Sequence, residues 1–371
     1  MPSRQPLNVG IVGCGTISAA YLKTFARLDA VKVVAVADID FSRAQAVATT
    51  HPGVRALTSE QLLADAGVDV VLNLTIPAAH AEVALGAIAT GKSVYGEKPL
   101  ATSTAEARKV VEAAATANVR IGCAPDTVLG TGIQTARKAV DDGNIGTPIS
   151  AIAILGTPGP ERWHPNPDFY YLPGGGPLLD MGPYYISALI TLLGPVASVI
   201  GAASHTRTTR TINAGPRKGE TIPVATDTHV TGVLTHASGA LSTLYMSFDT
   251  VATVSARIEL HGDQGSLVVP DPNTFDGDVR LRSLGATEWQ TLPVSAGYVD
   301  SSRGFGVADL AGTAEGREPR AGGRLAFHVL DVMESLLVSA QEGRVVRLES
   351  TCERPAPVPL QSLAATQPGV M

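Results

Sequence analysis

The chain is poor in cysteine, in aromatic residues and in charge, and each shortage excludes a class of protein. Its three cysteines, Cys14, Cys123 and Cys352, are odd in number and far apart, which rules out a disulfide framework or a cysteine metal site. Lys and Arg form no cluster, so we expect no nucleic-acid partner, because phosphate recognition needs a concentrated basic surface. The longest apolar runs, such as VKVVAVA, have the length of a strand, and we expect no membrane partner.

The N-terminus, MPSRQPLNVGIVG, does not read as a signal peptide, because no charged segment precedes a long apolar one. Together with the unpaired cysteines, this predicts a reduced, cytoplasmic compartment. The chain has 371 residues, of which 44% are hydrophobic and 17% charged, and a net charge of −6. This length and composition suit two compact globular domains, each large enough to bury a core.

Strands and helices are expected to alternate over the first third of the chain. The runs LNVGIVGCG and VKVVAVADID are nearly continuous in apolar residues, as in strands covered on both faces, and TISAAYLKTFARL between them has helical spacing. The alternation continues, with helices expected near 41–49, 59–66, 78–90 and 103–118 and strands near 54–57, 68–75, 92–95 and 119–124. This predicts an α/β fold with a doubly wound, parallel Rossmann sheet over residues 1–125.

A glycine-rich turn follows the first expected strand and opens the first helix. There Gly13 permits a tight turn, and Gly15 lets backbone amides approach a pyrophosphate at the helix N-terminus. Ser18 replaces the third glycine of the dinucleotide-binding fingerprint and is small enough for close packing of helix on strand. We expect Thr16 and Ile17, in the same turn, to contact the cofactor as well. A glycine turn in a nucleotide-free sheet is the alternative.

Asp38 ends the second strand and points to the choice of cofactor. It lies about twenty residues beyond the glycines, where a carboxylate hydrogen-bonds the adenosine ribose. The 2′-phosphate of NADP would meet Asp38 and Asp40 together, and this repulsion favours NAD. Arg43 is close by in the sequence and offsets the repulsion in part. We therefore expect NAD rather than NADP.

Four further segments carry a resemblance to a known family. They are TIPAAH at 75–80, GKSVYGEKPLA at 91–101, GNIGTP at 143–148 and GGGPLLDMGPYY at 174–185. With the glycine turn, they make the chain similar to the Gfo/Idh/MocA family, the relatives of glucose–fructose oxidoreductase and inositol dehydrogenase. The combination of EKP with GGG-x-x-x-D-x-G is the specific part of the match. The resemblance implies an NAD(P)-dependent oxidoreductase that acts on the CH–OH group of a sugar, a sugar derivative or a cyclic polyol.

The resemblance implies that Lys98, just past the fifth strand, is an active-site residue whose bond to Pro99 is often cis in relatives. The carboxyl ends of parallel strands form the ligand crevice, so a lysine there points into it. Beside an oxidised nicotinamide, desolvation and like charge would favour the neutral amine and suit it to polarise a substrate hydroxyl. From the residues alone, a surface lysine in a turn is the alternative.

The same resemblance implies a set of residues that line the cofactor. They are Thr75, Ile76, Pro77 and His80, and we expect Glu97 and Lys98 to join them. Taken alone, His80 reads as a surface residue at the N-terminus of a helix.

A second domain is expected over residues 126–371, where the alternation ends. One helix, at 128–143, is followed by runs such as ISAIAILG, TDTHVTGVLTH and GALSTLYMSF, which alternate polar and apolar residues as in an antiparallel sheet with one covered face. An amphipathic helix at 322–343 closes the domain. We expect an α+β domain with a large, mostly antiparallel open sheet, which in the resembled family is the interface of a homodimer or homotetramer.

Six of the seventeen aromatic residues lie between residues 161 and 185. An aromatic-lined pocket suits a small ligand, and the C–H faces of sugars pack well on aromatic rings. We expect Trp163, His164 and Tyr171 to contact the substrate. The alternative is that these aromatic side chains only cover the core of their own loop.

Asp180 and Tyr184 are four residues apart on the helix that follows the glycine triplet, so they share one face. Many family members have a histidine at the place of Tyr184. This departure resembles the tyrosine-type branch, in which tyrosine takes the acid/base position, and argues against a histidine-based proton relay. We expect Tyr184, with Lys98, to take the hydroxyl proton and Asp180 to orient the hydroxyl.

Asp126, which follows the sixth strand, is expected to reach the substrate, with a helix N-cap as the alternative. No metal site is expected, because His229 and His236 lack carboxylate or cysteine company.

Two other functions stay open. Oxidation of a hydroxyl acidifies the neighbouring C–H bonds, so the same site can cleave glycosides by NAD-dependent elimination without net redox change. A non-enzymatic nucleotide sensor with this fold is the other.

Overall fold

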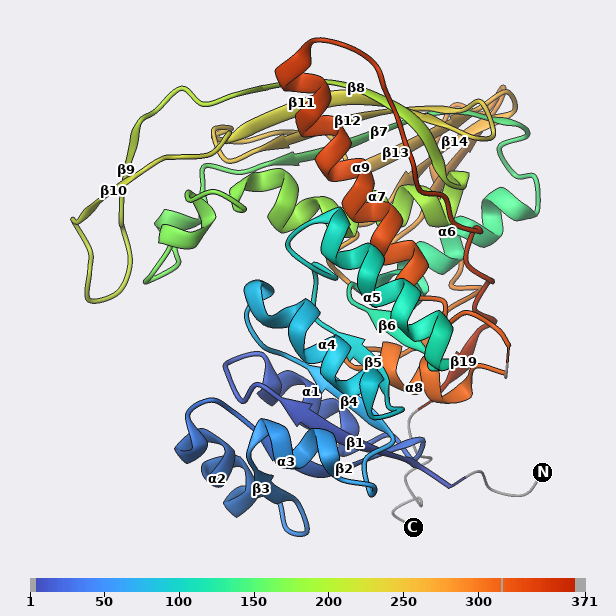
Figure 1. The fold of residues 1–371 in the computed structure, drawn as a ribbon. Helices are drawn as coiled ribbons and strands as arrows, with labels where there is room; N and C mark the ends of the chain where they lie inside the picture. Colours follow the sequence, from blue (N-terminus) through green and yellow to red (C-terminus); the bar gives the residue numbers. More distant parts are fainter. Residues whose placement is uncertain (1–4, 315, 364–371) are drawn as a thin grey trace, which may run out of the picture. The chain divides into compact units, whose positions relative to one another are not determined.

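The computed structural model describes residues 5–314 and 316–363 of the chain (Figure 1). The described chain divides into two compact units. The first comprises the residues up to Thr131, then Ala296–Phe327 and the residues from Pro355 onward, and the second comprises Gly132–Ser295 and His328–Arg354. The first boundary thus lies near the expected residue 125, but the expected contiguous stretch 126–371 is interrupted twice by segments that return to the first unit.

Six parallel strands form the sheet of the first unit, in the order β3-β2-β1-β4-β5-β6. They are β1 (Leu7–Val12), β2 (Val31–Ala37), β3 (Arg55–Leu57), β4 (Val70–Asn73), β5 (Ser93–Gly96) and β6 (Ile121–Cys123). All four residues of β4 are buried, as in a strand covered on both faces. The order is that of a Rossmann sheet, so the predicted parallel, doubly wound architecture is confirmed.

Helices follow the strands of this sheet in alternation. They are α1 (Ser18–Phe25), α2 (Phe41–Thr50), α3 (Ser59–Ala64), α4 (His80–Ala89) and α5 (Thr104–Ala117), with a short 3-10 helix at Pro77–Ala79. The returning segments add α8 (Phe305–Gly312), which packs near β6, and the paired strands β17 (Tyr298–Val299) and β19 (Gln361–Ser362). These pairings explain why segments from late in the sequence belong to the first unit.

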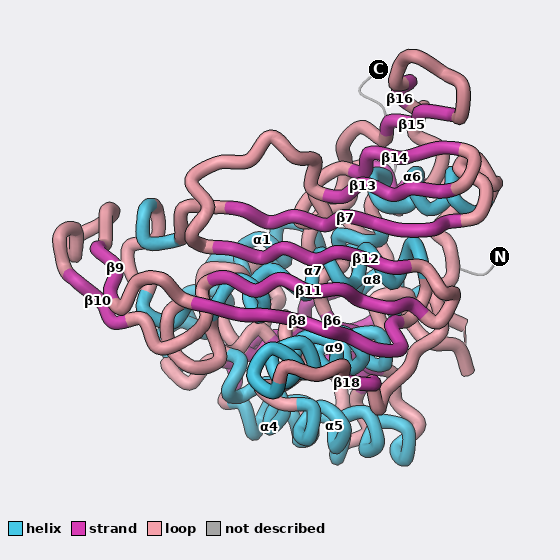
Figure 2. The backbone as a smooth tube through the Cα atoms, turned by 90° about the horizontal axis from the view of Figure 1, so that it is seen from above, coloured by secondary structure: helices cyan, strands magenta, loops and turns pink. Residues whose placement is uncertain are grey.

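Nine strands form the sheet of the second unit, in the order β16-β15-β14-β13-β7-β12-β11-β8-β18 (Figure 2). They are β7 (Pro148–Gly156), β8 (Val196–Ser204), β11 (His229–His236), β12 (Leu241–Ser247), β13 (Ile258–Gly262), β14 (Gly265–Val269), β15 (Arg280–Ser283), β16 (Gln290–Thr291) and β18 (Val346–Arg347). Neighbouring strands are antiparallel except β7 and β12, which run parallel. The predicted large, mostly antiparallel sheet is confirmed.

Helices of the second unit cover one face of this sheet, and they are α6 (Thr131–Asp141), α7 (Gly176–Leu193) and most of α9 (Gly323–Glu342). Helix α7 packs on β7, β11 and β12, and α9 is the closing helix expected at 322–343. The other face carries exposed apolar side chains: Ile152 of β7 is exposed between the buried Ala151 and Ala153, and Ile200 and Leu241 are exposed on β8 and β12. A separate hairpin is formed by β9 (Thr209–Thr211) and β10 (Thr221–Pro223).

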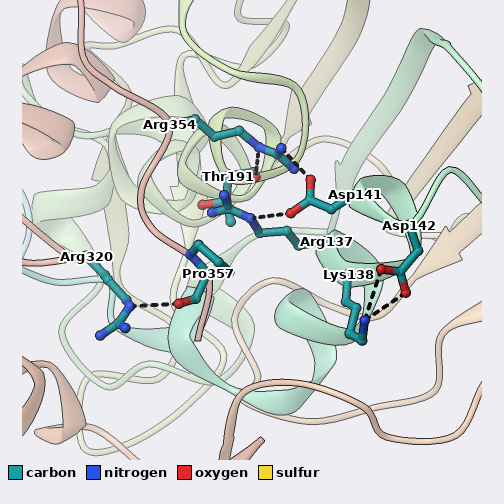
Figure 3. Close-up of polar contacts among 8 residues, drawn as sticks. All are labelled: Arg137, Lys138, Asp141, Asp142, Thr191, Arg320, Arg354 and Pro357. Atoms are coloured by element: carbon teal, nitrogen blue, oxygen red, sulfur yellow. Dashed lines mark hydrogen bonds and ion pairs between the residues drawn. The ribbon is translucent and has the colours of Figure 1, made fainter. Parts of the chain in front are cut away.

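The segments that precede and follow α9 in the sequence are held by the side chains of Arg320 and Arg354 (Figure 3). In the second unit, Arg354 donates from Nε to the carbonyl oxygen of Thr191 at 2.7 Å, and its Nη1 pairs with Oδ1 of Asp141 at 2.5 Å. In the first unit, Arg320 donates from Nε to the carbonyl oxygen of Pro357 at 3.2 Å.

Among the residues described, no helix has both the length and the apolar composition of a membrane span.

Candidate active site

The turn after β1 has the geometry that dinucleotide binding requires. Gly13 has a φ of +102°, and a Cβ atom on it would lie 2.6 Å from the carbonyl oxygen of Leu74, so glycine is needed there. A Cβ atom on Gly15, in contrast, would meet no atom of the described chain within 4 Å. The backbone of Gly15 is therefore open to a bulky ligand, as the approach of a pyrophosphate demands.

Helix α1 begins at this turn without a side-chain cap among the described residues, because its N-cap residue is Ile17. Ser18 is buried, and its hydroxyl donates to the carbonyl oxygen of Gly15 at 2.7 Å, so serine fills the third glycine position within the packed turn. Thr16 is exposed beside it. Uncapped amides at a helix N-terminus attract anions, so this turn fits the pyrophosphate of NAD.

Asp38 ties the glycine turn to the end of β2. Its Oδ2 accepts the amide N–H of Cys14 at 2.7 Å, and its Oδ1 accepts the amide N–H of Asp40 at 2.9 Å. Each carboxylate oxygen has a second acceptor position, so a bond to ribose is compatible with these contacts and stays a prediction. Arg43 pairs with Asp40 at 3.5 Å. This engagement of the nearby arginine supports NAD over NADP.

The loop after β4 contains Thr75, Ile76 and Pro77. Asn73, the buried last residue of β4, holds this loop: its Oδ1 accepts the hydroxyl of Thr75 at 2.6 Å, and its Nδ2 donates to the carbonyl oxygen of His80 at 3.0 Å. Ile76 is 70% exposed and offers an apolar surface to a ring. Sequence reasoning missed Asn73, although an amide that closes an apolar strand was an available signal.

Lys98 lies where the chain leaves β5, is half-buried, and has a cis bond to Pro99, as the resemblance implied. Glu97 beside it accepts the hydroxyl of Tyr21 at 2.8 Å through Oε1 and the amide N–H of Lys98 at 3.2 Å through Oε2. Burial, and then the charge of Glu97, raise the pKa of Tyr21 well above its ordinary value, so the phenol stays a donor. Glu97 thus shapes the turn that presents Lys98, and Tyr21 is a supporting residue that the sequence analysis missed.

His80 is buried rather than on the surface. Its Nδ1 lies 2.6 Å from the carbonyl oxygen of Pro99, and its Nε2 lies 3.1 Å from the carbonyl oxygen of Thr75. Both ring nitrogens are therefore engaged by the protein, and no polar atom of the ring remains for a cofactor. This corrects both sequence-based interpretations of His80, the surface residue and the direct cofactor contact.

Asp126 is also corrected by the structure, because its side chain is completely buried. Its Oδ2 accepts the amide N–H groups of Gly304 at 2.8 Å and Gly306 at 3.0 Å, at the start of α8. It makes no side-chain cap to the 3-10 helix that follows it. Asp126 therefore neither reaches a substrate nor caps its own helix; it caps a helix far away in the sequence. Burial raises the pKa of Asp126 to about 6.

The raised pKa predicts how stability depends on pH. The folded chain holds the proton of Asp126 more tightly than the unfolded chain, so the stability contributed by the protonated carboxyl is present below pH 4 and lost as the pH rises to about 6. Asp126→Asn keeps an oxygen for both glycine amides and carries no charge. We expect it to unfold like the wild type near pH 4 and to be more stable by about 3 kcal/mol at pH 7. Urea unfolding at both pH values measures this, and a difference that does not vary with pH would contradict it.

In the second unit, α7 carries both Asp180 and Tyr184. A Cβ atom on Gly175 would lie 2.4 Å from the carbonyl oxygen of Phe169, and Gly176 has a φ of +90°, so the glycine triplet lets α7 begin directly against the preceding loop. Tyr184 is buried and Asp180 is half-buried. Their spacing of four residues in one helix places both side chains on the same face, as expected.

The loop before α7 contains a cluster of aromatic rings. Trp163 contacts His164 at 5.4 Å between ring centres, and His164 contacts Phe169 at 5.4 Å and Tyr170 at 5.6 Å. Trp163 nevertheless stays 65% exposed. The rings thus support one another while offering an aromatic surface, and the expected substrate contacts of Trp163 and His164 stay predictions.

Tyr171 is the exception in this loop, because it is completely buried. Its hydroxyl donates to the buried carboxylate of Glu161, and the guanidinium of Arg210 lies 5.2 Å from the centre of its ring. Arg210 in turn pairs with Glu161 at 3.2 Å and with Asp249. The expected substrate contact of Tyr171 is therefore wrong: its hydroxyl stabilises the loop from inside. Glu161 and Arg210 are the partners that sequence reasoning missed.

The open glycine turn, the carboxylate after β2 and the strand order are those of a dinucleotide-binding Rossmann fold. The model of the oxidoreductase family's NAD-binding Rossmann fold matches residues 7–124, and that of the GFO/IDH/MocA C-terminal domain matches residues 133–268. The chain belongs to the Gfo/Idh/MocA oxidoreductase family.

Named relatives agree with this assignment. The chain is 30% identical to 1,5-anhydro-D-fructose reductase of Ensifer adhaerens, over 70% of this chain and 74% of the relative. It is 26% identical to D-apiose dehydrogenase of Paraburkholderia graminis, over 93% of this chain and 91% of the relative. A solved NAD binding oxidoreductase from Klebsiella pneumoniae has the same fold, with a TM-score of 0.81 at 23% identity, over 92% of this chain and 99% of that one.

Proposed function

We propose that the protein is an NAD(H)-dependent oxidoreductase that acts on a secondary alcohol of a sugar, a sugar derivative or a cyclic polyol. The observation that carries this proposal is the order of three neighbouring strands, β1, β4 and β5. The glycine turn, the Thr75–Pro77 loop and Lys98 follow these strands in turn, so they share the carboxyl edge of one parallel sheet. This edge is where ligands bind in open α/β sheets.

Each group of residues around this edge would bind one part of NAD. Gly13, Gly15 and the N-terminus of α1 receive the pyrophosphate, Asp38 receives the ribose, and Thr75 and Ile76 line the nicotinamide. Bound NAD supplies the hydride acceptor, and the protein supplies binding, orientation and electrostatics.

We propose three catalytic residues. Lys98 binds and polarises the substrate hydroxyl, Tyr184 accepts the proton of that hydroxyl, and Asp180 orients it. Each carries a group of the required kind: an amine that donates hydrogen bonds, a phenol that exchanges a proton, and a carboxylate that accepts a hydrogen bond.

The aromatic loop supports a carbohydrate or polyol substrate. Trp163 and His164 offer ring faces against which sugar C–H groups pack, and the engaged rings around them keep these faces in place. The relatives named above act, by their names, on 1,5-anhydro-D-fructose and on D-apiose. The ring faces of the aromatic loop and the substrates of these relatives together favour a small, compact carbohydrate over a polymer.

We further propose that the protein is a cytoplasmic homodimer or homotetramer, assembled through the exposed face of the large sheet. Ile152, Ile200 and Leu241 make this face apolar, and a face of this kind is rarely left to water. Light scattering of the purified protein tests this, and a monomer would contradict it. The three cysteines are free in the structure, in keeping with a reducing compartment.

NADH formation, followed by absorbance, tests the proposed activity directly. Purified protein is incubated with NAD, and separately with NADP, against a panel of aldoses, anhydro-sugars, glycosides and inositols. We expect NADH from at least one compound, little NADPH, and loss of the signal in Tyr184→Phe. Tight NAD binding without NADH from any compound would contradict a simple dehydrogenase; released aglycone without NADH would indicate cleavage by elimination.

A further inference from the structure

His80 joins two loops of the first unit. It is the first residue of α4, it is buried, and its ring lies between the loop after β4 and the turn after β5. Nδ1 faces the carbonyl oxygen of Pro99 at 2.6 Å, and Nε2 faces that of Thr75 at 3.1 Å. One ring thus contacts both the residue that follows Lys98 and the loop expected to bind nicotinamide.

The chemistry of these contacts is restrictive. Carbonyl oxygens only accept hydrogen bonds, and a neutral imidazole has a single N–H. The ring is therefore held by one close polar contact on each side, and its tautomer decides which nitrogen donates. Asn73 completes the arrangement, because it donates to the carbonyl oxygen of His80 and accepts the hydroxyl of Thr75. The two loops are therefore joined through side chains whose polar atoms are paired.

We propose that His80 is a positioning residue with two separable tasks. The contact of Nδ1 with the carbonyl oxygen of Pro99 fixes the direction of Lys98, and the contact of Nε2 with the carbonyl oxygen of Thr75 fixes the nicotinamide loop. The inference rests on the proposed function, since it takes Lys98 as catalytic and the Thr75 loop as cofactor-binding.

Amide side chains separate the two tasks. In His80→Asn the amide nitrogen occupies the place of Nδ1 and keeps the bond to Pro99, whereas in His80→Gln it reaches the place of Nε2 and keeps the bond to Thr75. His80→Leu keeps apolar volume and loses both bonds. His236 provides a matched control in the second unit, because it is also buried and its ring also makes two contacts, with the carbonyl oxygen of Gly194 at 2.7 Å and with Ser242 at 2.8 Å.

Two measurements are made on each full-length variant: the Kd for NADH from nicotinamide fluorescence, and kcat at saturating NAD with the substrate found in the panel. We expect His80→Asn to raise Kd about ten-fold with kcat near the wild type, and His80→Gln to lower kcat about ten-fold with Kd near the wild type, the effect of one lost hydrogen bond. His80→Leu should show both changes, and His236→Leu neither.

Equal changes of Kd and kcat in the Asn and Gln variants would overturn the proposal, because they would show that His80 only supports packing. So would a wild-type Kd and kcat in His80→Leu. A failure of the proposed function can be told apart from a failure of this proposal. A wild-type kcat in Lys98→Met would refute the catalytic role of Lys98. The Kd values of the His80 variants for NADH would still test the role of the Thr75 loop.

Discussion

A Lys98→Met enzyme is expected to bind NADH like the wild type and to turn over about 10³-fold more slowly. The substitution removes the amine that binds and polarises the substrate hydroxyl. It leaves the turn intact, because Glu97 bonds to the backbone amide of residue 98 and His80 bonds to the carbonyl of Pro99. The loss should therefore fall on kcat, as it does when an interaction made mainly in the transition state is removed.

Lys109→Met is the matched control, because Lys109 is exposed on α5 in the same unit. It removes the same amine from a surface position, so kcat and the Kd for NADH should both stay at wild-type values. Thermal unfolding of the two variants shows whether either has lost the fold. A Lys98→Met enzyme that is folded, binds NADH and keeps its kcat would refute the catalytic role of Lys98.

The architecture of the first unit could be predicted because its signals are local. Apolar runs of strand length alternate with helical spacing, and the connections between them are short, so the parallel order follows from the rules for such chains. The glycine turn was predictable for the same reason: Gly13 and Gly15 act through their own backbone. In the second unit, alternating runs with turn residues at their ends predicted the antiparallel sheet.

The roles of His80 and Asp126 could not be predicted, because their partners are distant in the sequence. Pro99 lies 19 residues from His80, and Gly304 lies 178 residues from Asp126. A single sequence gives a propensity to each residue but no pairing between residues. A histidine at a helix start therefore read as exposed, and an aspartate after a strand read as a cap or a ligand. Burial reverses both interpretations.

The return of late segments to the first unit could not be predicted for a related reason. The segment Ala296–Phe327 has no sequence feature that separates it from the large sheet before it. It returns to the first unit because α8 packs near β6 and because Asp126 accepts two amides at the start of α8. These are tertiary contacts, which leave no period or turn signal in the chain.

The second large effect is expected at Arg210, where Arg210→Met should lower the free energy of unfolding of the second unit by about 3–5 kcal/mol. Arg210 is buried and pairs with two carboxylates, those of Glu161 and Asp249, while Tyr171 donates to Glu161. Methionine fills a similar volume but leaves the buried carboxylate of Glu161 and the part-buried carboxylate of Asp249 without a cation. Urea unfolding followed by circular dichroism measures the loss.

We attribute the lost stability of Arg210→Met to unpaired charges rather than to lost packing, and a triple variant separates these two causes. In Arg210→Met with Glu161→Gln and Asp249→Asn the cluster has no charge, so most of the lost stability should return. Arg217→Met is the control: Arg217 pairs with Asp168 and Glu220 at the surface, where water screens the charges, and its loss should change unfolding little. A triple variant as unstable as Arg210→Met would contradict the assignment to charge.

Because Glu161 lies two residues before Trp163, Arg210→Met should also raise KM by loosening the aromatic loop, and the triple variant should lower it again.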